Sequence, residues 1–150
     1  MKLPEPLFVL INPMVRILLS SPLHGLLSGS VMLIRFKGRR SGREFVTPVR
    51  YIRHENTIQC FTGRTNQWWR NMRDGADVVL RLAGKESHFR MAAIPSDPER
   101  ISQSLKRLLT EFPQDAPYYN IRMLRDRTPD LETLNKAGFN TVLVEAVAVV

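Results

Sequence analysis

The sequence predicts a mainly β domain with peripheral helices, in which six strands form a small closed or half-closed antiparallel barrel. Six short segments have strand character, because they alternate apolar with polar residues or are rich in β-branched and aromatic residues. Short turns connect most of them, and no regular alternation of strands with helices indicates a parallel sheet. With 150 residues, 43% of them hydrophobic, residues 1–150 are expected to form a single domain with one core.

Residues 1–28 are predicted to be a helical segment that precedes the strands. Asn12 and Ser21 each stand before a proline, which is typical of an N-cap, so short helices are expected at 13–20 and 22–28. The apolar run is too interrupted for a spanning helix, which needs about 20 apolar residues, and it lacks the pattern of a signal peptide. Its leucines suit packing on the barrel, which we favour, or contact with a membrane surface.

The predicted strands and helices follow in order. Strands are expected at 32–37, 45–53, 57–62, 78–82, 87–92 and 141–150. A short helix is expected at 68–73, and a long one begins at Pro98 after an N-cap at Ser96 or Asp97. Residues 113–128 are expected to be irregular or short helical, and a brief helix at 129–137 is expected to end at Gly138.

The net charge of +8 comes from one quarter of the chain. Residues 35–73 hold ten basic and two acidic residues, whereas the rest of the chain has twelve of each. Nine of the ten are arginine, whose planar guanidinium binds phosphate or carboxylate through two parallel hydrogen bonds. The distribution therefore predicts an anion-binding site in this quarter.

Several kinds of site are absent from the sequence. It contains no glycine-rich dinucleotide or phosphate loop, no serine nucleophile motif and no clustered histidines, so no metal site is expected. Its single cysteine, Cys60, permits no internal disulfide and fits a reducing, cytoplasmic compartment. Cys60 lies within a predicted strand and is expected to be a small core residue.

The turn after the first strand is the strongest local signal for a binding site. Gly38 and Gly42 bracket it, so that backbone N–H groups can converge. Arg39, Arg40 and Arg43 add positive charge, and Ser41 adds a hydroxyl donor. The pattern suits a phosphate site, although a solvated basic hairpin tip would have the same composition.

Three further segments have features of a ligand site. Proline cannot donate to a strand ladder, so Thr47-Pro48-Val49 marks a bulge or an edge where a ligand can approach the backbone. Thr62-Gly63-Arg64 forms a second loop of small residues with an arginine. In Trp68-Trp69-Arg70-Asn71, two aromatic rings beside a basic residue suit a flat ring with an anionic tail, or else one core anchor and one rim residue.

These motifs in this order resemble the deazaflavin-dependent nitroreductase family, whose members are split β-barrels related to FMN-binding barrels. The resemblance runs from about residue 12 to residue 82 and implies a homodimer that binds coenzyme F-420, with FMN as the alternative cofactor. It implies cofactor-binding roles for Arg39, Arg40, Ser41, Gly42, Arg43, Thr47, Pro48, Val49, Thr62, Gly63, Arg64, Trp68 and Asn71. Tyr118 and Tyr119 are candidates for the substrate wall. Because the cofactor supplies the chemistry, no catalytic side chain is expected.

The expected function is hydride transfer from reduced coenzyme F-420 to a small electron-poor acceptor such as a quinone, an enone or a nitro compound. The alternatives are an FMN-dependent reductase and a flavin- or deazaflavin-binding module without turnover. A surface for single-stranded nucleic acid would also use arginine and tryptophan, but here the basic residues bracket tight turns instead of following one exposed face. Peripheral membrane contact through residues 1–28 is compatible with each of these functions.

Overall fold

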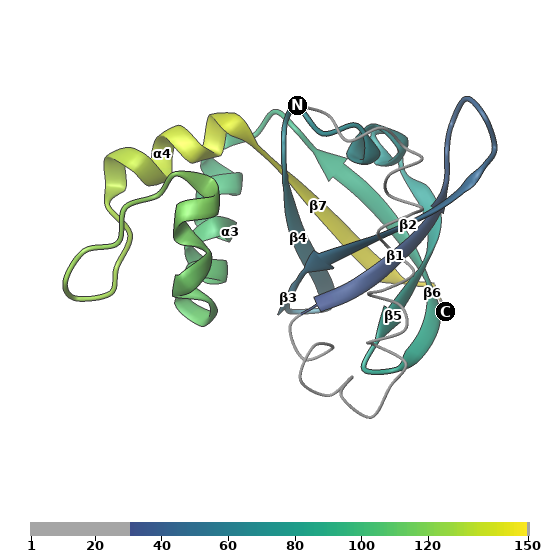
Figure 1. Cartoon of the computed structure of the whole chain (residues 1–150), viewed down its shortest axis with the longest axis horizontal. Coiled ribbons are helices and arrows are strands. Elements are labelled where there is room, and N and C mark those ends of the chain that lie inside the picture. The colour runs from purple at the N-terminus through teal and green to yellow at the C-terminus, as the bar shows by residue number, and fades with distance from the viewer. Residues whose placement is uncertain (1–30, 150) are drawn as a thin grey trace.

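The computed structural model describes residues 31–149, so the helices predicted at 13–20 and 22–28 lie outside the described range. Seven strands form one antiparallel sheet in the order β2-β1-β5-β6-β7-β4-β3, which curls into a half-barrel (Figure 1). The strands are β1 (Val31–Lys37), β2 (Glu44–Arg50), β3 (Ile52–His54), β4 (Thr57–Gly63), β5 (Ala76–Leu82), β6 (Lys85–Ile94) and β7 (Thr141–Ala148). The helices are α3 (Pro98–Glu111), α4 (Leu131–Asn140) and the 3₁₀ helices η1 (Trp68–Met72) and η2 (Pro113–Tyr119).

The predicted fold class is confirmed, but the predicted number of strands, six, is wrong. The segment predicted as one strand at 45–53 is divided at Tyr51 into β2 and β3. β2 pairs with β1 at one edge of the sheet, and β3 pairs with β4 at the other edge. One continuous stretch of chain therefore joins the two edges, which is why the sheet curls.

Two apolar clusters lie on opposite faces of the sheet. Inside the barrel, alternate residues of the strands, such as Ile34 and Leu80, pack around Trp69 and Met72 of η1. On the outer face of β4 and β7, Phe61 and other strand residues pack against α3, α4 and η2. Burial of each large apolar side chain contributes about 1.5–3 kcal/mol, so both clusters stabilise the fold.

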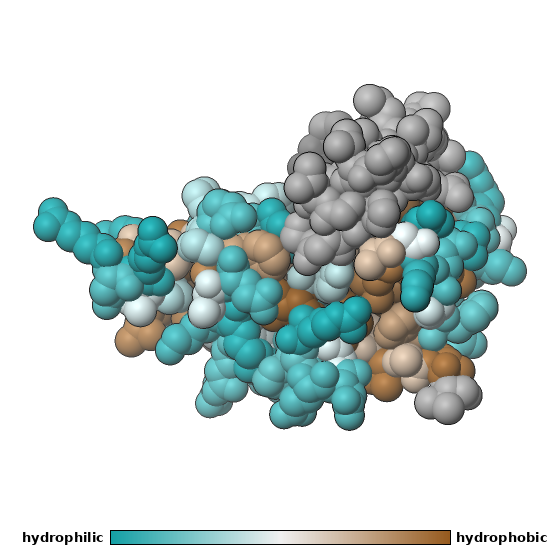
Figure 2. Space-filling model, turned by 90° about the horizontal axis from the view of Figure 1, so that it is seen from below, coloured by the Kyte–Doolittle hydropathy of each residue, from teal (hydrophilic) through white to brown (hydrophobic). Residues whose placement is uncertain are grey.

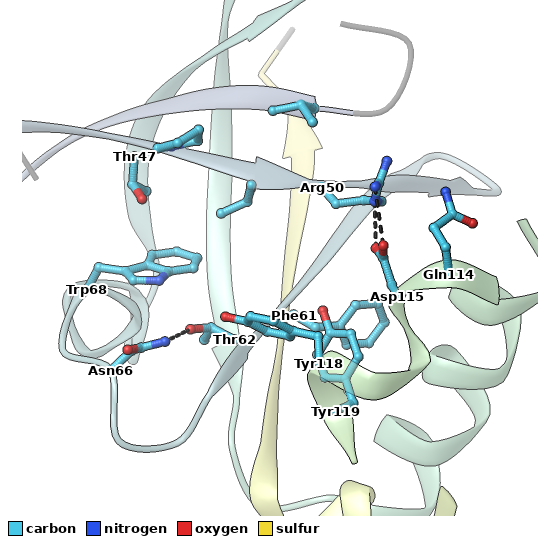
Figure 3. A pocket seen from close by; sticks show the side chains of 13 residues that line it. Thr47, Arg50, Phe61, Thr62, Asn66, Trp68, Gln114, Asp115, Tyr118 and Tyr119 are labelled. Atoms are coloured by element: carbon cyan, nitrogen blue, oxygen red, sulfur yellow. Dashed lines mark hydrogen bonds and ion pairs between the residues drawn. The ribbon is translucent and has the colours of Figure 1, made fainter. Parts of the chain in front are cut away.

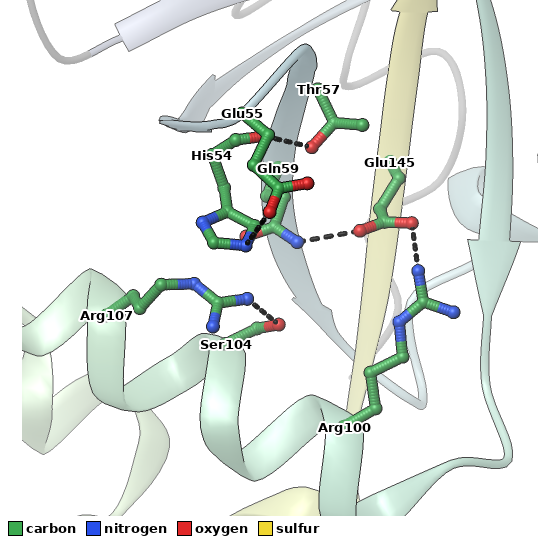
Figure 4. Close-up of polar contacts among 8 residues, drawn as sticks. All are labelled: His54, Glu55, Thr57, Gln59, Arg100, Ser104, Arg107 and Glu145. Atoms are coloured by element: carbon green, nitrogen blue, oxygen red, sulfur yellow. Dashed lines mark hydrogen bonds and ion pairs between the residues drawn. The ribbon is translucent and has the colours of Figure 1, made fainter.

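The long helix α3 begins as predicted. The Asp97 side chain accepts a hydrogen bond from the backbone N–H of Arg100, and Pro98 occupies the first turn. Arg100 also donates to the Glu145 carboxylate on β7, whose other oxygen accepts from the Gln59 amide on β4 at 2.7 Å (Figure 4). This hydrogen-bonded chain fixes the start of α3 against two neighbouring strands.

The helix predicted at 129–137 has different bounds. α4 runs from Leu131 to Asn140, so the prediction that it ends at Gly138 is wrong. Gly138 instead lies where α4 packs on the first turn of α3: a Cβ atom there would be 2.5 Å from both the Pro98 carbonyl oxygen and the Ser102 Oγ. The glycine is needed for close approach of the two helices.

The loop between η2 and α4 extends away from the barrel (Figure 1). Hydrophilic side chains dominate that end of the molecule on the face shown in Figure 2. Its arginines include Arg125, which is exposed. No helix within residues 31–149 is long and apolar enough to cross a bilayer.

Cys60 is fully buried in the barrel, and this burial raises the pKa of its thiol. We expect it to react with a disulfide reagent such as DTNB only when the barrel opens, because the reactive form is the exposed thiolate. The measurement is the rate of DTNB reaction, with and without denaturant, which should rise in parallel with unfolding followed by circular dichroism. Rapid modification of the native protein would contradict this placement.

Candidate functional site

The basic turn between β1 and β2 is a compact hydrogen-bonded loop. The Gly38 N–H donates to the Arg43 carbonyl at 2.8 Å, and the Gly42 N–H donates to the Gly38 carbonyl at 2.9 Å. Gly42 has a φ of +67°, a conformation that glycine adopts without strain. The Ser41 hydroxyl oxygen accepts from the Arg43 N–H at 3.2 Å, which leaves its own proton available to donate.

Asn71 of η1 holds this turn against the barrel. Its side-chain oxygen accepts from the Arg39 backbone N–H at 2.8 Å, and its amide nitrogen donates to the Trp68 carbonyl at 2.9 Å. One side chain thus connects the turn to the helix that carries Trp68. The backbone of the turn is thereby positioned independently of the arginine side chains.

A cavity of about 600 Å³ lies between the turn and η1, and we call it the arginine cavity. Its lining residues are Gly38, Arg39, Arg40, Ser41, Gln67, Arg70, Asn71 and Arg73. None of its four arginines forms an ion pair with another residue in the described part of the chain. Such a concentration of uncompensated positive charge favours a polyanionic ligand.

Two arginines of this cavity are also positioned by Trp69. The guanidinium groups of Arg70 and Arg73 lie 4.7 and 5.2 Å from the centre of its rings. The Arg70 Nε is buried and has no hydrogen-bond partner among residues 31–149. A buried donor without a partner is unfavourable, so this N–H is able to donate to an acceptor group on a ligand in the cavity.

A second cavity, of about 440 Å³, includes Trp68 of η1 in its lining and is called here the tyrosine cavity (Figure 3). Thr47, Pro48 and Val49 of β2 form one wall. A second wall runs from β4 to η1 and consists of Phe61, Thr62, Asn66 and Trp68. The remaining lining residues of the cavity are Val31, Arg50, Gln114, Asp115, Tyr118 and Tyr119. Its size and its mixture of apolar surface with a few polar groups are typical of a small-molecule site.

The polar groups along the wall between β4 and η1 are fixed. The Asn66 amide donates to the Thr62 Oγ1 at 2.8 Å, and Thr62 is buried. Trp68 is also nearly buried, and its ring packs against Phe36 with centres 6.4 Å apart. A ligand entering here would therefore meet a largely preformed wall.

The two tyrosines of η2 differ in their surroundings. Tyr118 is 70% exposed, whereas Tyr119 packs edge-on against Phe61 and against Tyr118. Burial raises the pKa of Tyr119, with a further contribution from Tyr118, so its phenol keeps its proton at neutral pH. The Tyr119 hydroxyl can therefore donate a hydrogen bond to a ligand at the cavity wall, and Tyr118 is the more exposed of the two side chains.

Arg50 and Asp115 form an ion pair between β2 and η2. The Arg50 Nε and Nη2 donate to the two carboxylate oxygens of Asp115 at 2.5 and 3.2 Å. The guanidinium of Arg50 also lies 4.4 Å from the centre of the Phe112 ring. These contacts fix the start of η2, and so the tyrosines, above the cavity.

The structure divides the predicted site residues into three groups. The first group lines the tyrosine cavity: Thr47, Pro48, Val49, Thr62, Trp68, Tyr118 and Tyr119. The second group lines the arginine cavity: Arg39, Arg40, Ser41 and Asn71. Gly42, Arg43, Gly63 and Arg64 line neither. Arg64 instead donates to the carbonyls of Pro95 and Phe139, and Arg43 lies 5.7 Å from the centre of the Phe45 ring. The ligand contacts of all these residues stay predictions.

Several lining residues were not singled out by sequence motifs. Arg50, Asn66, Gln114 and Asp115 line the tyrosine cavity, and Arg73 lines the arginine cavity. The arginines belong to the basic quarter, whereas no sequence signal indicates Gln114 or Asp115. Within residues 31–149, no cluster of His, Cys, Asp and Glu could hold a metal ion.

No family model and no curated protein sequence matches this chain, but its fold resembles known structures. A pyridoxamine 5'-phosphate oxidase-related, FMN binding protein from Nostoc punctiforme aligns with a TM-score of 0.53 and 13% identity, over 93% of this chain and 80% of the other. A protein described as a domain-swapped dimer aligns with a TM-score of 0.52 and 16% identity, over 93% and 98%. An F420 reductase aligns with a TM-score of 0.48 and 11% identity, over 87% and 95%.

The chain spans 47% of another neighbour, the protein Atu2129 from Agrobacterium tumefaciens. At these identities the likeness concerns the fold. The described chain has a split β-barrel fold like that of the FMN-binding protein from Nostoc punctiforme, as the sequence predicted.

Proposed function

We propose that the protein is an oxidoreductase that binds a flavin-type cofactor, coenzyme F-420, and passes a hydride to a small electron-poor acceptor. The observation that carries the proposal is that residues of η1 line both cavities. Trp68 lines the tyrosine cavity, and its carbonyl is bonded to Asn71, which lines the arginine cavity. A flat ring and an anionic tail on one molecule would fill both.

The charge of the arginine cavity supports coenzyme F-420 over FMN. A single phosphate group is satisfied by about two guanidinium groups, each forming two parallel hydrogen bonds. Four arginines without acidic partners in the described chain, one with a buried unpaired Nε, suit a longer anion with a phosphodiester and several carboxylates. In this proposal Arg39, Arg40 and Ser41 hold the phosphodiester, and Arg70 and Arg73 hold the start of the tail.

The tyrosine cavity provides positioning rather than acid–base chemistry. Bound reduced coenzyme would supply the hydride from its ring carbon. Thr47, Pro48 and Val49 would orient the edge of the ring, while Trp68 and Thr62 limit its tilt. The end of the cavity beside η2, with Gln114, Tyr118 and Tyr119, then remains for the acceptor. We also propose that two copies associate as a homodimer, as the sequence resemblance implies, and that the protein is cytoplasmic, because its single cysteine fits a reducing compartment.

The test is a fluorescence titration of the purified full chain with coenzyme F-420 and, in parallel, with FMN. We expect micromolar or tighter binding of F-420, much weaker binding of FMN, and oxidation of reduced F-420 when menadione is added. Tighter binding of FMN would favour the FMN-dependent reductase, which the fold shared with an FMN-binding protein makes the second candidate. Tight binding of F-420 without oxidation by any acceptor would indicate a carrier module, and binding of neither would contradict the proposal.

A further inference from the structure

We propose that the Arg50–Asp115 ion pair selects the acceptor by its charge. The pair keeps the η2 end of the tyrosine cavity neutral, so that neutral planar acceptors bind and anionic ones are disfavoured. The inference rests on the proposed function, because it assigns the η2 end of the cavity to the acceptor. It adds a specificity-determining pair that no sequence motif indicated.

The first support is the charge of the cavity lining. Of the residues around the tyrosine cavity, Arg50 and Asp115 are the charged ones, and all the others are neutral at pH 7. Because the two carry opposite charges and are joined by two hydrogen bonds, their fields largely cancel. The cavity therefore offers no counter-ion to a charged ligand, and an anion that entered it would lose hydration without compensation.

The second support is that the pair is held in place. The side chains of Arg50 and Asp115 are 27% and 19% exposed, so that they are shielded from much of the solvent. The face of the guanidinium lies against the Phe112 ring at 4.4 Å, and its Nε and Nη2 are engaged by the carboxylate. The Nε and Nη2 groups of Arg50 are thus engaged by Asp115 and not free to donate to a ligand.

The third support is the position of the pair. Figure 3 shows Arg50, Asp115 and Gln114 at one end of the cavity, and Thr47 and Trp68 at the other. The Trp68 end adjoins η1 and the arginine cavity, where the coenzyme is proposed to lie. The pair therefore lies at the end left for the acceptor, where loss of either charge would change the field that acts on that ligand.

The experiment measures quinone binding without coenzyme, through quenching of tryptophan fluorescence, since Trp68 lines the cavity. The probes are menadione, which is neutral, and 1,4-naphthoquinone-2-sulfonate, which is anionic. Asp115→Asn should raise the ratio of sulfonate to menadione affinity by roughly tenfold, because Arg50 becomes an unpaired cation. Arg50→Gln should lower this ratio, and the double variant and Asp115→Glu should return it close to the value of the unchanged protein.

The control variant is Asp77→Asn, which changes the net charge by the same amount as Asp115→Asn. Asp77 lies on β5, outside the tyrosine cavity, and is the exposed ion-pair partner of Arg90 on β6. This variant should leave the ratio unchanged. The titrations are repeated in the Arg39→Ala/Arg40→Ala background, which weakens any binding of the sulfonate in the arginine cavity. Circular dichroism of each variant shows whether the barrel is retained.

An unchanged ratio in Asp115→Asn would overturn the inference. An equal loss of menadione and sulfonate affinity would also overturn it, since this would show that the pair only holds η2 in place. A failure of menadione to bind the unchanged protein would overturn it as well. The outcome is separable from that of the proposed function. If F-420 binds while the ratio does not shift, this inference alone fails; if the ratio shifts while F-420 does not bind, the coenzyme assignment fails.

Discussion

Replacement of Arg39 and Arg40 by alanine is expected to raise the dissociation constant of coenzyme F-420 by about tenfold or more, because each charge-assisted hydrogen bond contributes about 1.5–3 kcal/mol. The fold of the turn should survive. Asn71 binds the backbone N–H of Arg39, and the bonds of Gly38 and Gly42 are also between backbone groups, so no side chain that is removed supports them. The measurement is the F-420 fluorescence titration of the double variant.

The matched control is the double variant Arg53→Ala/Arg125→Ala. Both of these arginines are exposed and line neither cavity. This second double variant loses the same net charge, so it reports the long-range field alone, and it should bind F-420 almost as the unchanged protein does at physiological salt. Equal binding by Arg39→Ala/Arg40→Ala and the unchanged protein would remove the basic turn from the coenzyme site. Equal weakening in both double variants would mean that overall charge, and not the turn, attracts the coenzyme.

Gly138→Ala is expected to lower the free energy of unfolding by about 1–3 kcal/mol, the range typical of an overpacked contact. The added methyl would lie 2.5 Å from the Pro98 carbonyl oxygen and the Ser102 Oγ, so α3 and α4 must separate. Alanine has a higher helix propensity than glycine by about 1 kcal/mol, and the steric term must exceed this gain. Urea denaturation followed by circular dichroism gives the value.

Lys136→Ala is the control for Gly138→Ala, because Lys136 lies on the same helix with an exposed side chain. It should change the free energy of unfolding by less than about 0.5 kcal/mol. If Gly138→Ala were as stable as the unchanged protein or more so, the close contact between the two helices would not exist in solution.

Much of the fold could be predicted because its signals are local. The alternation of Met32, Ile34 and Phe36 with Leu33, Arg35 and Lys37 predicted β1, and Asp97-Pro98 predicted the start of α3. The division at Tyr51 could not be predicted, since residues 45–53 have continuous strand character and the bend depends on which edges the two halves join. Gly138 was mistaken for a helix end because glycine at a helix terminus and glycine at a helix crossing have the same local pattern.

The parts of the candidate site that are contiguous in the sequence could also be predicted, whereas contacts between distant segments could not. The basic turn and Thr47-Pro48-Val49 are contiguous motifs, so the sequence indicates them directly. The Arg50–Asp115 pair joins residues 65 positions apart. Nothing in the residues around Asp115 specifies its partner, because that contact depends on how η2 packs against the barrel. Identification of this pair therefore required the three-dimensional structure.

The place of β7 in the sheet has a consequence for how the protein is made. β7 is the last strand along the chain, yet it lies between β6 and β4, inside the sheet. Until β7 has left the ribosome, β4 and β6 each lack a neighbour, and their apolar residues have no complete barrel to enter. Barrel closure therefore has to wait for residues 141–148, and a nascent chain that ends before residue 141 would expose two unpaired edges to chaperones and to other chains.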